Sequence, residues 1–329
     1  MKKLSKVLMV LMLASCVFTG CSKKGEKVRT VNIAIQPSAA FMPMYLCKEM
    51  GWIEEALAES QVQVKWNEFE SGPPINESLA AGLSDIGTNG DVPTVSAIAV
   101  GQKVTIVGVP GNGPDAYAVL ASADNNSVKS FKDLKGKKIA TVIGSTGHNL
   151  TKKLLEKNGM TFDDIEFINI AAGDVGIVLS TKQVDAAVIW EPNVTRLVDN
   201  GTAKIIAQGS DTNLRGTNTF LARTDYIKNN PDVISTILEQ YARAVKALPT
   251  MDEATLKKVA DDLKLSIPQL LSIYKKYGFA VQCDAVDTAA LQDTCQFLVS
   301  IGRLEKEYQV KDHVDNSYYN NSKAADYLK

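Results

Sequence analysis

The 329-residue sequence predicts an α/β protein of two lobes, and three patterns indicate this fold class. Short apolar runs typical of strands alternate with longer helical patterns between residues 31 and 222. The alternation restarts after a polar loop near residue 125. A last strand pattern at residues 219–222 precedes a stretch that is helical only. We therefore expect the second lobe to be inserted into the first, with a two-strand hinge between them.

The first lobe is expected to comprise residues 31–117 and 218–329. Residues 31–36 alternate apolar and polar side chains, as a half-buried strand does, and residues 104–109 resemble a buried strand. Further strands are expected at residues 62–68, 85–87 and 219–222. Helices are expected at residues 42–57, 73–82, 91–99, 231–248, 253–265, 267–277 and 286–302. The polar residues from Asp315 onward predict a disordered tail.

The second lobe is expected to comprise residues 118–217. Its strands are expected at residues 117–122, 139–143, 167–170, 186–189 and 204–207. Its helices are expected at residues 146–158, 175–181 and 192–200. Because short strands alternate with helices at this spacing, we expect mostly parallel sheets. The chain should cross between the lobes near residues 117–122 and 218–222.

The first residues of the chain have the order of a lipoprotein signal peptide. Three basic residues come first, Lys2, Lys3 and Lys6. Residues 7–13 are wholly apolar, and residues 18–21 read Phe-Thr-Gly-Cys. The alternatives are a membrane helix or an ordinary secretion signal, but the apolar run is too short to span a bilayer.

This leader predicts where the protein is located. We expect residues 1–20 to be removed, Cys21 to carry lipid, and residues 21–30 to form a linker. The protein would then lie outside the cytoplasm and be attached to the cell membrane. Its compartment would be a periplasm or the outer surface of the cytoplasmic membrane.

Charge and cysteine content narrow the function. Removal of the three leader lysines takes the formal net charge from −1 to −4, and a weakly acidic protein is a poor partner for nucleic acid. The cysteines lack metal-site spacing such as C-x-x-C, so neither a metal nor a cofactor is expected. Cys47 lies in an apolar helical pattern and should be a core residue. Cys283 and Cys295 form either a disulfide or two buried thiols.

Small polar turns follow several predicted strands and open the next helix. They occupy residues 37–40, 70–74, 88–91, 144–149 and 190–192. The carboxyl ends of strands in an open α/β sheet are where ligands collect. A helix start there offers unpaired N–H groups and a partial positive charge, which glycine and serine let an anion approach. Because these turns contain no Lys or Arg, we expect an anion to be held mainly by neutral donors.

Individual residues in these turns have more than one interpretation. Asn89, Ser145 and Thr146 can add amide or hydroxyl donors. Asp91 is most simply the N-cap of its helix. His148 either donates to the ligand or makes a structural hydrogen bond. Trp190 either walls the ligand or belongs to the core.

Three groups of residues, taken together, match the motifs of a known family. The first comprises Phe-Glu-Ser-Gly-Pro at 69–73, Ala-Gly-Leu-Ser-Asp-Ile-Gly at 81–87 and Thr-Asn-Gly-Asp-Val-Pro at 88–93. The second comprises Leu-Lys-Gly-Lys-Lys-Ile-Ala at 134–140 and Gly-Ser-Thr-Gly-His-Asn at 144–149. The third comprises Val-Asp-Ala at 184–186 and Ile-Trp-Glu-Pro at 189–192. Over residues 31–300 the chain resembles the aliphatic sulfonate/taurine/nitrate substrate-binding family of ABC importers, and most closely its alkanesulfonate branch.

The resemblance implies a type II periplasmic-binding-protein fold whose lobes close on a ligand. The closed form would deliver that ligand to a cognate ABC permease driven by its ATPase. By position in the family motifs, the anion would lie among Gly72, Asn89, Gly90, Ser145, Thr146 and His148. Trp190 and Glu191 would line the rest of the cleft, with Gln36 nearby. The candidate ligand-binding residues also include Asp91 and Asn218.

The sequence departs from the alkanesulfonate branch at two places. Asn193 stands where a second aromatic residue is frequent. Residues 215–220 read Arg-Gly-Thr-Asn-Thr-Phe, where small and aromatic residues are more usual. We therefore expect a more polar pocket, which leaves the organic part of the ligand open.

The expected function is that of a lipid-anchored solute receptor for an ABC importer, with an aliphatic sulfonate as its ligand. A receptor for nitrate, taurine or a thiamine-pyrimidine precursor is the alternative on the same fold. A pyrimidine-synthesising enzyme on this fold would need a reactive histidine and clustered cysteines, whereas the chain has only His148 and His313 and no cysteine cluster. A surface sensor or adhesion lipoprotein would need no deep cleft.

Overall fold

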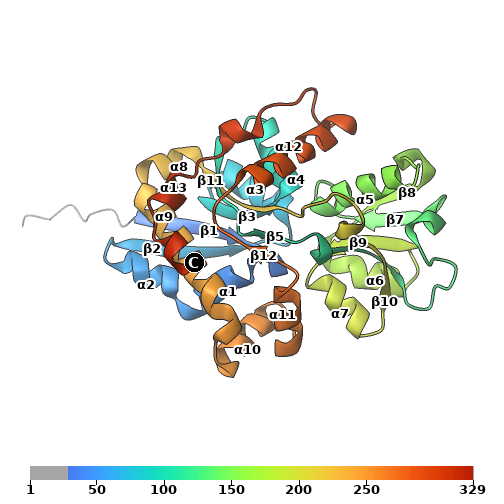
Figure 1. Ribbon diagram of the computed structural model, residues 1–329, viewed down its shortest axis with the longest axis horizontal. Coiled ribbons are helices and arrows are strands. Elements are labelled where there is room, and N and C mark those ends of the chain that lie inside the picture. The colour runs from blue at the N-terminus through green and yellow to red at the C-terminus, as the bar shows by residue number, and fades with distance from the viewer. Residues whose placement is uncertain (1–28, 329) are drawn as a thin grey trace, which may run out of the picture.

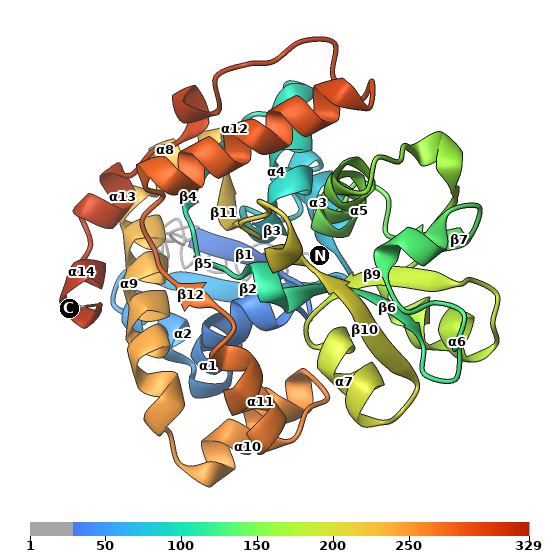
Figure 2. The same cartoon turned by 45° about the vertical axis from the view of Figure 1, so that its right-hand side comes forward.

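The computed structural model describes residues 29–328, whose longer strands form two five-stranded sheets, one in each lobe (Figure 1). The predicted leader, Cys21 and most of the predicted linker lie outside the described residues. Lobe 1 contains the sheet of order β2-β1-β3-β11-β4, and lobe 2 contains the sheet of order β10-β6-β9-β7-β8. Figure 2 shows the two sheets and their helices side by side, with the chain passing between them twice.

The sheet of lobe 1 is mixed. Its strands are β2 (Val62–Glu68), β1 (Arg29–Ile35), β3 (Ile86–Gly90), β11 (Asn218–Arg223) and β4 (Val104–Gly108). β1 pairs in parallel with β2 and β3, whereas β11 pairs antiparallel with β3 and β4. Because β4 is antiparallel to β11, it runs in the same direction as β1, β2 and β3, so the sheet is mostly parallel, as expected, and β11, which returns from the other lobe, is the exception.

Helices cover both faces of this sheet. They are α1 (Met42–Met50), α2 (Trp52–Ala58), α3 (Gly72–Ala80), α4 (Asp91–Ala99), α8 (Thr224–Asn229), α9 (Pro231–Ala247), α10 (Glu253–Asp262), α11 (Ile267–Tyr274) and α12 (Ala285–Ser300). The single helix predicted at residues 42–57 is two helices, because Gly51 has a left-handed backbone with φ of 64°. The amphipathic pattern of α9 places Ile237 and Tyr241 fully inside the core.

The C-terminal residues continue the fold of lobe 1. α13 (Ser317–Asn320) and α14 (Ala324–Tyr327) both pack against α9. Tyr318 and Ala324 are buried there. The expectation of a disordered tail from Asp315 is therefore wrong for the described residues, because two apolar contacts anchor a segment whose composition is mainly polar.

Lobe 2 repeats the alternation on a smaller scale. Its strands are β10 (Ala203–Gln208), β6 (Tyr117–Ser122), β9 (Ala186–Trp190), β7 (Lys138–Thr141) and β8 (Glu166–Asn169). Its α-helices are α5 (Thr146–Lys157), α6 (Val175–Ser180) and α7 (Asn193–Asp199). β7 pairs in parallel with β8 and β9, and β6 pairs antiparallel with β9 and β10. β6 is therefore the one strand of this sheet that runs opposite to the other four, so this sheet is also mostly parallel, as expected.

Two connections join the lobes, and both precede the strands expected to cross. β6 lies wholly in the sheet of lobe 2 and β11 wholly in that of lobe 1. The crossings are residues 113–116 and 209–217, which meet where the Gly113 N–H donates to the Gly216 carbonyl at 3.3 Å. A two-stranded sheet of β5 (Gly111–Asn112) and β12 (Gly278–Phe279) lies beside them.

The lobes touch along both sides of the interface between them. Lys153 of α5 pairs with Asp293 of α12 at 2.6 Å, and Gln269 of α11 donates to Asp199 of α7 at 2.7 Å. The Ala39 N–H of lobe 1 also donates to the Glu191 carbonyl of lobe 2 at 3.1 Å. The structure therefore represents a closed arrangement of the two lobes.

The three cysteines of the described residues are buried and form no disulfide with one another. Cys283 and Cys295 are two buried free thiols, which decides between the two interpretations of this pair. Cys47 is buried in the core, as expected, and its thiol contacts the Gln240 carbonyl at 3.3 Å. Within residues 29–328, none of the helices has the length and apolar character needed to cross a bilayer.

Candidate functional site

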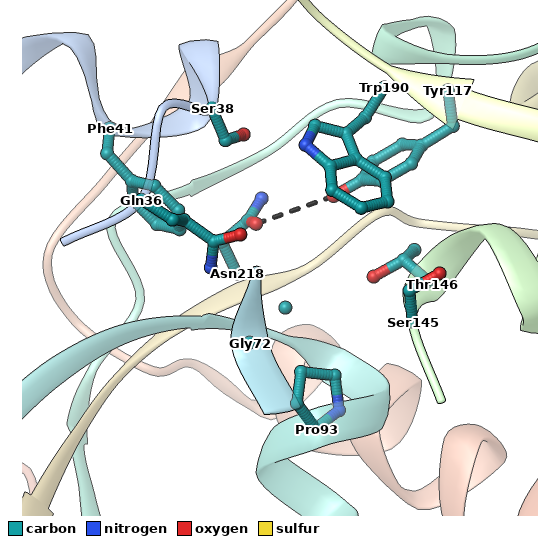
Figure 3. Close-up of a pocket in the computed structure, with 11 residues that line it drawn as sticks. Gln36, Ser38, Phe41, Gly72, Pro93, Tyr117, Ser145, Thr146, Trp190 and Asn218 are labelled. Atoms are coloured by element: carbon teal, nitrogen blue, oxygen red, sulfur yellow. Dashed lines mark hydrogen bonds between the residues drawn. The ribbon is translucent and has the colours of Figure 1, made fainter. Parts of the chain in front are cut away.

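A small cavity lies between the lobes and is lined from both sides (Figure 3). Lobe 1 contributes Gln36, Ser38, Phe41, Gly72, Gly90, Pro93 and Asn218. Lobe 2 contributes Tyr117, Ser145, Thr146 and Trp190. These residues come from the carboxyl ends of β1, β3 and β9, from the turn between β1 and α1, from the starts of α3, α4 and α5, and from the first residues of β6 and β11. A ligand in this cavity would therefore contact both lobes.

Three helices begin at the cavity wall. Gly72 is the first residue of α3, Gly90 precedes α4, and Ser145 caps α5. The first N–H groups of a helix lack intrahelical acceptors and carry the positive end of the helix dipole. The Ser145 hydroxyl oxygen accepts from the Gly147 N–H at 3.1 Å, so its own hydrogen can be donated to a ligand.

The lining carries no charged side chain. Among the described residues that form the wall, none is Lys, Arg, His, Asp or Glu. Tyr117 is the one ionisable group of this lining, and burial raises its pKa well above the usual value, so the phenol stays neutral. The cavity can therefore hold an anion through hydroxyls, amides and the backbone N–H groups at the helix starts.

Aromatic rings face the cavity from both lobes. Figure 3 shows the Trp190 ring beside the Tyr117 ring, with Phe41 across the cavity. The Tyr117 hydroxyl donates to the Asn218 side-chain oxygen at 3.4 Å. These rings, with Pro93, provide apolar surface for the organic part of a ligand.

The close approach of the lobes at this site depends on Gly90. A Cβ atom at this position would lie 2.6 Å from the Thr146 hydroxyl oxygen of the opposite lobe. Any larger residue at position 90 would therefore push α5 away from α4.

The structure brings together some of the predicted site residues. Those that line the cavity are Gln36, Gly72, Gly90, Ser145, Thr146, Trp190 and Asn218. Sequence reasoning missed Ser38, Phe41, Pro93 and Tyr117. Ser38 and Pro93 belong to segments already recognised as turns or motifs, but the direction of the Phe41 and Tyr117 side chains had no signal in the sequence.

Other predicted site residues lie behind the wall. Asn89 is fully buried and donates to Asn76 at 2.9 Å. Glu191 is fully buried, forms an ion pair with Lys276 at 2.5 Å, and accepts the Thr195 N–H of α7 at 3.0 Å. Their contribution to ligand binding stays a prediction, and it would act through the residues that line the cavity.

Asp91 has a different role from the expected one. Gly90 is the N-cap of α4 and Asp91 is the first residue inside the helix, so the interpretation of Asp91 as the N-cap is wrong. Its carboxylate is buried and instead contacts residues of both lobes.

His148 lies outside the cavity in an aromatic cluster. Its ring centroid is 5.4 Å from that of Phe162, 5.0 Å from that of Phe167 and 5.2 Å from that of Phe297. Burial lowers the pKa of His148 to about 4, so the ring is neutral at pH 7. Its Nδ1 accepts a hydrogen bond from the Gly144 N–H at 3.4 Å. Of the two interpretations of His148, this contact agrees with the structural hydrogen bond.

A second cavity adjoins the first at Trp190, which lines both. Asn193 and Arg196 of α7 form one side of this second cavity, opposite Asp262 and Lys264 of lobe 1. Asn193, one of the departures from the family pattern, therefore lies beyond Trp190. Arg215, the first residue of the other departure, pairs with Asp287 at 2.7 Å and is absent from the lining of the first cavity.

Within residues 29–328, no three His, Cys, Asp or Glu side chains lie close enough together to hold a metal ion.

Comparison with known proteins gives one family. Residues 38–251 match the family described as NMT1/THI5 like. A Bacillus subtilis protein named for aliphatic sulfonate binding is 30% identical over 315 residues, which are 95% of this chain and 93% of the relative. An Escherichia coli protein of the same name is 31% identical over 229 residues, which are 70% of each chain.

Solved structures show the same fold. The periplasmic aliphatic sulphonate binding protein SsuA from Escherichia coli has a TM-score of 0.77 and 26% identity, covering 87% of this chain and 92% of its own. The alkanesulfonate-binding protein SsuA from Xanthomonas axonopodis pv. citri, bound to MOPS, has a TM-score of 0.79 and 27% identity, covering 87% and 98%. The predicted two-lobed periplasmic-binding-protein fold and the resemblance to sulfonate-binding proteins are thereby confirmed.

Proposed function

Because the chain belongs to the NMT1/THI5-like family, we propose that it is an extracytoplasmic solute-binding protein of an ABC importer. Its ligand is a small organic anion, and an aliphatic sulfonate fits the site best. The protein captures this anion between its lobes and delivers it to the cognate permease, which its ATPase drives.

The observation that carries this proposal is the composition of the interlobe cavity. Neutral donors and helix starts surround one part, which suits a sulfonate group, and Phe41, Tyr117 and Trp190 surround another, which suits an organic tail. Ligand contacts with both lobes are complete only in the closed form, so binding shifts the population toward closure. The names of the relatives support the choice of sulfonate.

The same cavity supports binding rather than catalysis. Its described lining contains no cysteine, histidine, lysine or carboxylate that could act as a nucleophile or general base. The relatives reported above are likewise named as binding proteins.

A flat heteroaromatic ligand, such as a thiamine-pyrimidine precursor, is the second candidate. Trp190 is nearly the only aromatic residue in the turns predicted from the sequence. Phe41 and Tyr117 line the same cavity, however, and a flat aromatic ligand could stack on these rings. Such a guest would leave the three helix starts without an anion, so we rank it below the sulfonate.

A ligand panel tests the proposal. The purified protein is titrated with methanesulfonate, longer alkanesulfonates, taurine, nitrate, sulfate and an aminopyrimidine, and its melting temperature and heat of binding are measured. An alkanesulfonate at a hundred times its Kd should stabilise the protein by about 2.7 kcal/mol. Binding of the aminopyrimidine alone would favour the second candidate, and silence across the panel would remove the small-ligand proposal.

The lipid anchor is tested separately. We propose that Cys21 carries lipid, on the basis of the leader that precedes it. Cys21→Ala should move the protein from the membrane fraction to the soluble fraction, whereas the matched control Cys16→Ala should leave it membrane-bound. Continued membrane attachment of Cys21→Ala would show that another segment holds the protein there.

A further inference from the structure

Asp91 joins the two lobes directly behind the cavity. It is the first residue of α4 and is 3% exposed. Its Oδ1 accepts from the Thr146 hydroxyl at 2.5 Å, and its Oδ2 accepts from the Asn149 amide at 3.2 Å. Both donors belong to α5 of lobe 2. The Thr294 hydroxyl of α12 also donates to Oδ2, at 2.8 Å.

Two opposing effects act on the charge of Asp91. Both oxygens accept hydrogen bonds, and the residue stands at a helix start, where the dipole stabilises negative charge. Burial raises the pKa of Asp91, while hydrogen bonds from Thr146, Thr294, Asn149 and the Val92 N–H oppose that rise.

This carboxylate is one residue away from the ligand space. Thr146 touches Asp91 and also lines the cavity. The cavity lining contains no cationic side chain among the described residues that could offset the charge of Asp91. An ionised Asp91 would therefore repel each negative charge that enters the cavity, in a poorly screened interior, while the helix starts attract it.

We propose that Asp91 is ionised in the folded protein and selects the ligand by charge: it tolerates a monoanion such as a sulfonate and disfavours a dianion of similar shape, such as sulfate or a phosphate monoester. Through Thr146 and Asn149 the same carboxylate fixes the start of α5 against lobe 1. The inference rests on the proposed function, because it requires an anion in this cavity.

Asp91→Asn removes the charge and can keep the hydrogen bonds. The Asn149 side-chain oxygen is buried and has no hydrogen-bond partner, so rotation of that amide would let it accept from the new amide. The Thr294 hydroxyl can also accept a hydrogen bond from the new amide N–H. The Thr146 hydroxyl can still donate to the side-chain oxygen that the substitution retains. The variant should therefore fold, which thermal unfolding would check.

The experiment measures the Kd of methanesulfonate and of sulfate by calorimetry at pH 7.5. The wild type should prefer methanesulfonate, and Asp91→Asn should raise the affinity for sulfate relative to methanesulfonate by about tenfold. The matched control is Asp287→Asn, which removes another buried carboxylate, paired with Arg215 and outside the cavity lining. It should leave the ratio unchanged.

An unchanged ratio in Asp91→Asn, or an equal change in Asp287→Asn, would overturn the charge selection while leaving anion binding intact. Absence of binding to both anions in the wild type would instead overturn the proposed function. If Asp91→Asn fails to fold, the wild type is instead titrated with methyl phosphate, which changes from monoanion to dianion near pH 6. Its affinity relative to methanesulfonate should fall from pH 5 to pH 8 in the wild type, and a constant ratio would overturn the inference.

Discussion

Ser145 has two roles in the site: it caps a helix, and it lines the cavity. Its hydroxyl oxygen caps α5 by accepting from the Gly147 N–H, and the residue lines the interlobe cavity. A serine at a helix start is predictable from sequence, because capping is local. Its exposure to a ligand follows from the packing of α5 beside the other lobe.

Ser145→Asp should abolish anion binding without unfolding the protein. Aspartate is as good an N-cap as serine, so the free energy of unfolding should change by less than about 1 kcal/mol. Its negative charge would stand where the ligand anion is expected, and calorimetry should detect no binding. The matched control is Ser266→Asp, the same change at the N-cap of α11, a residue absent from the cavity lining. Retained affinity in Ser145→Asp would place the anion site elsewhere.

Among the elements, the two connections between the lobes are the most constrained. Gly216 has a φ of 66°, and a Cβ there would lie 2.8 Å from the Gly113 carbonyl oxygen and 2.8 Å from the Tyr117 ring. Both a left-handed backbone and a close contact therefore require glycine at this point. The crossings predicted from the sequence lie a few residues too late in the chain. The apolar pattern of β6 and β11 identifies each as a strand but does not tell which of the two sheets it joins.

Gly216→Ala should destabilise the protein more than Gly201→Ala does. Gly201 has a similar φ of 75°, but a Cβ there would have no neighbouring atom within 4 Å, so only backbone strain of about 1 kcal/mol is expected. At Gly216 the steric contact should add about 1–3 kcal/mol. Urea unfolding of the two variants measures the difference, and equal losses would show that the connections relax freely.

The whole molecule is held closed by contacts that cross between the lobes, and the cluster around His148 is one of them. His148, Phe162 and Phe167 belong to lobe 2, while Phe297 lies on α12 of lobe 1. The neutral imidazole packs there as an aromatic ring, and protonation would place a charge among three phenyl groups. Closure is therefore coupled to the protonation of this residue.

Stability should fall as the pH decreases from about 6.5 toward 4. The His148 pKa is about 4 in the folded protein and about 6.5 in the unfolded chain, so the unfolded chain takes up the proton first. The stability due to the neutral ring is complete above pH 6.5 and is about 2 kcal/mol lower at pH 5. Denaturant unfolding at pH 8 and pH 5 measures this loss. His148→Phe should lose less over the same range, and an identical loss would assign the effect to other groups.

The sequence by itself determined the order of strands and helices and the glycine-containing turns, free of Lys and Arg, at the starts of α3, α4 and α5. These features follow from local periodicity and capping, which depend on neighbouring residues. The break of the first predicted helix at Gly51 was also available locally, because glycine is the usual C-cap, but the apolar pattern continued across it.

Only the tertiary structure decided which side chains face the ligand space and which bridge the lobes. Phe41 and Tyr117 turn into the cavity, whereas His148 and Glu191 turn away from it. Asp91 has the sequence context of an ordinary helix cap, yet its carboxylate meets Thr146 of the other lobe and Thr294, which is 203 positions away in the chain. Such contacts depend on how distant segments pack, and no local pattern of residues encodes that.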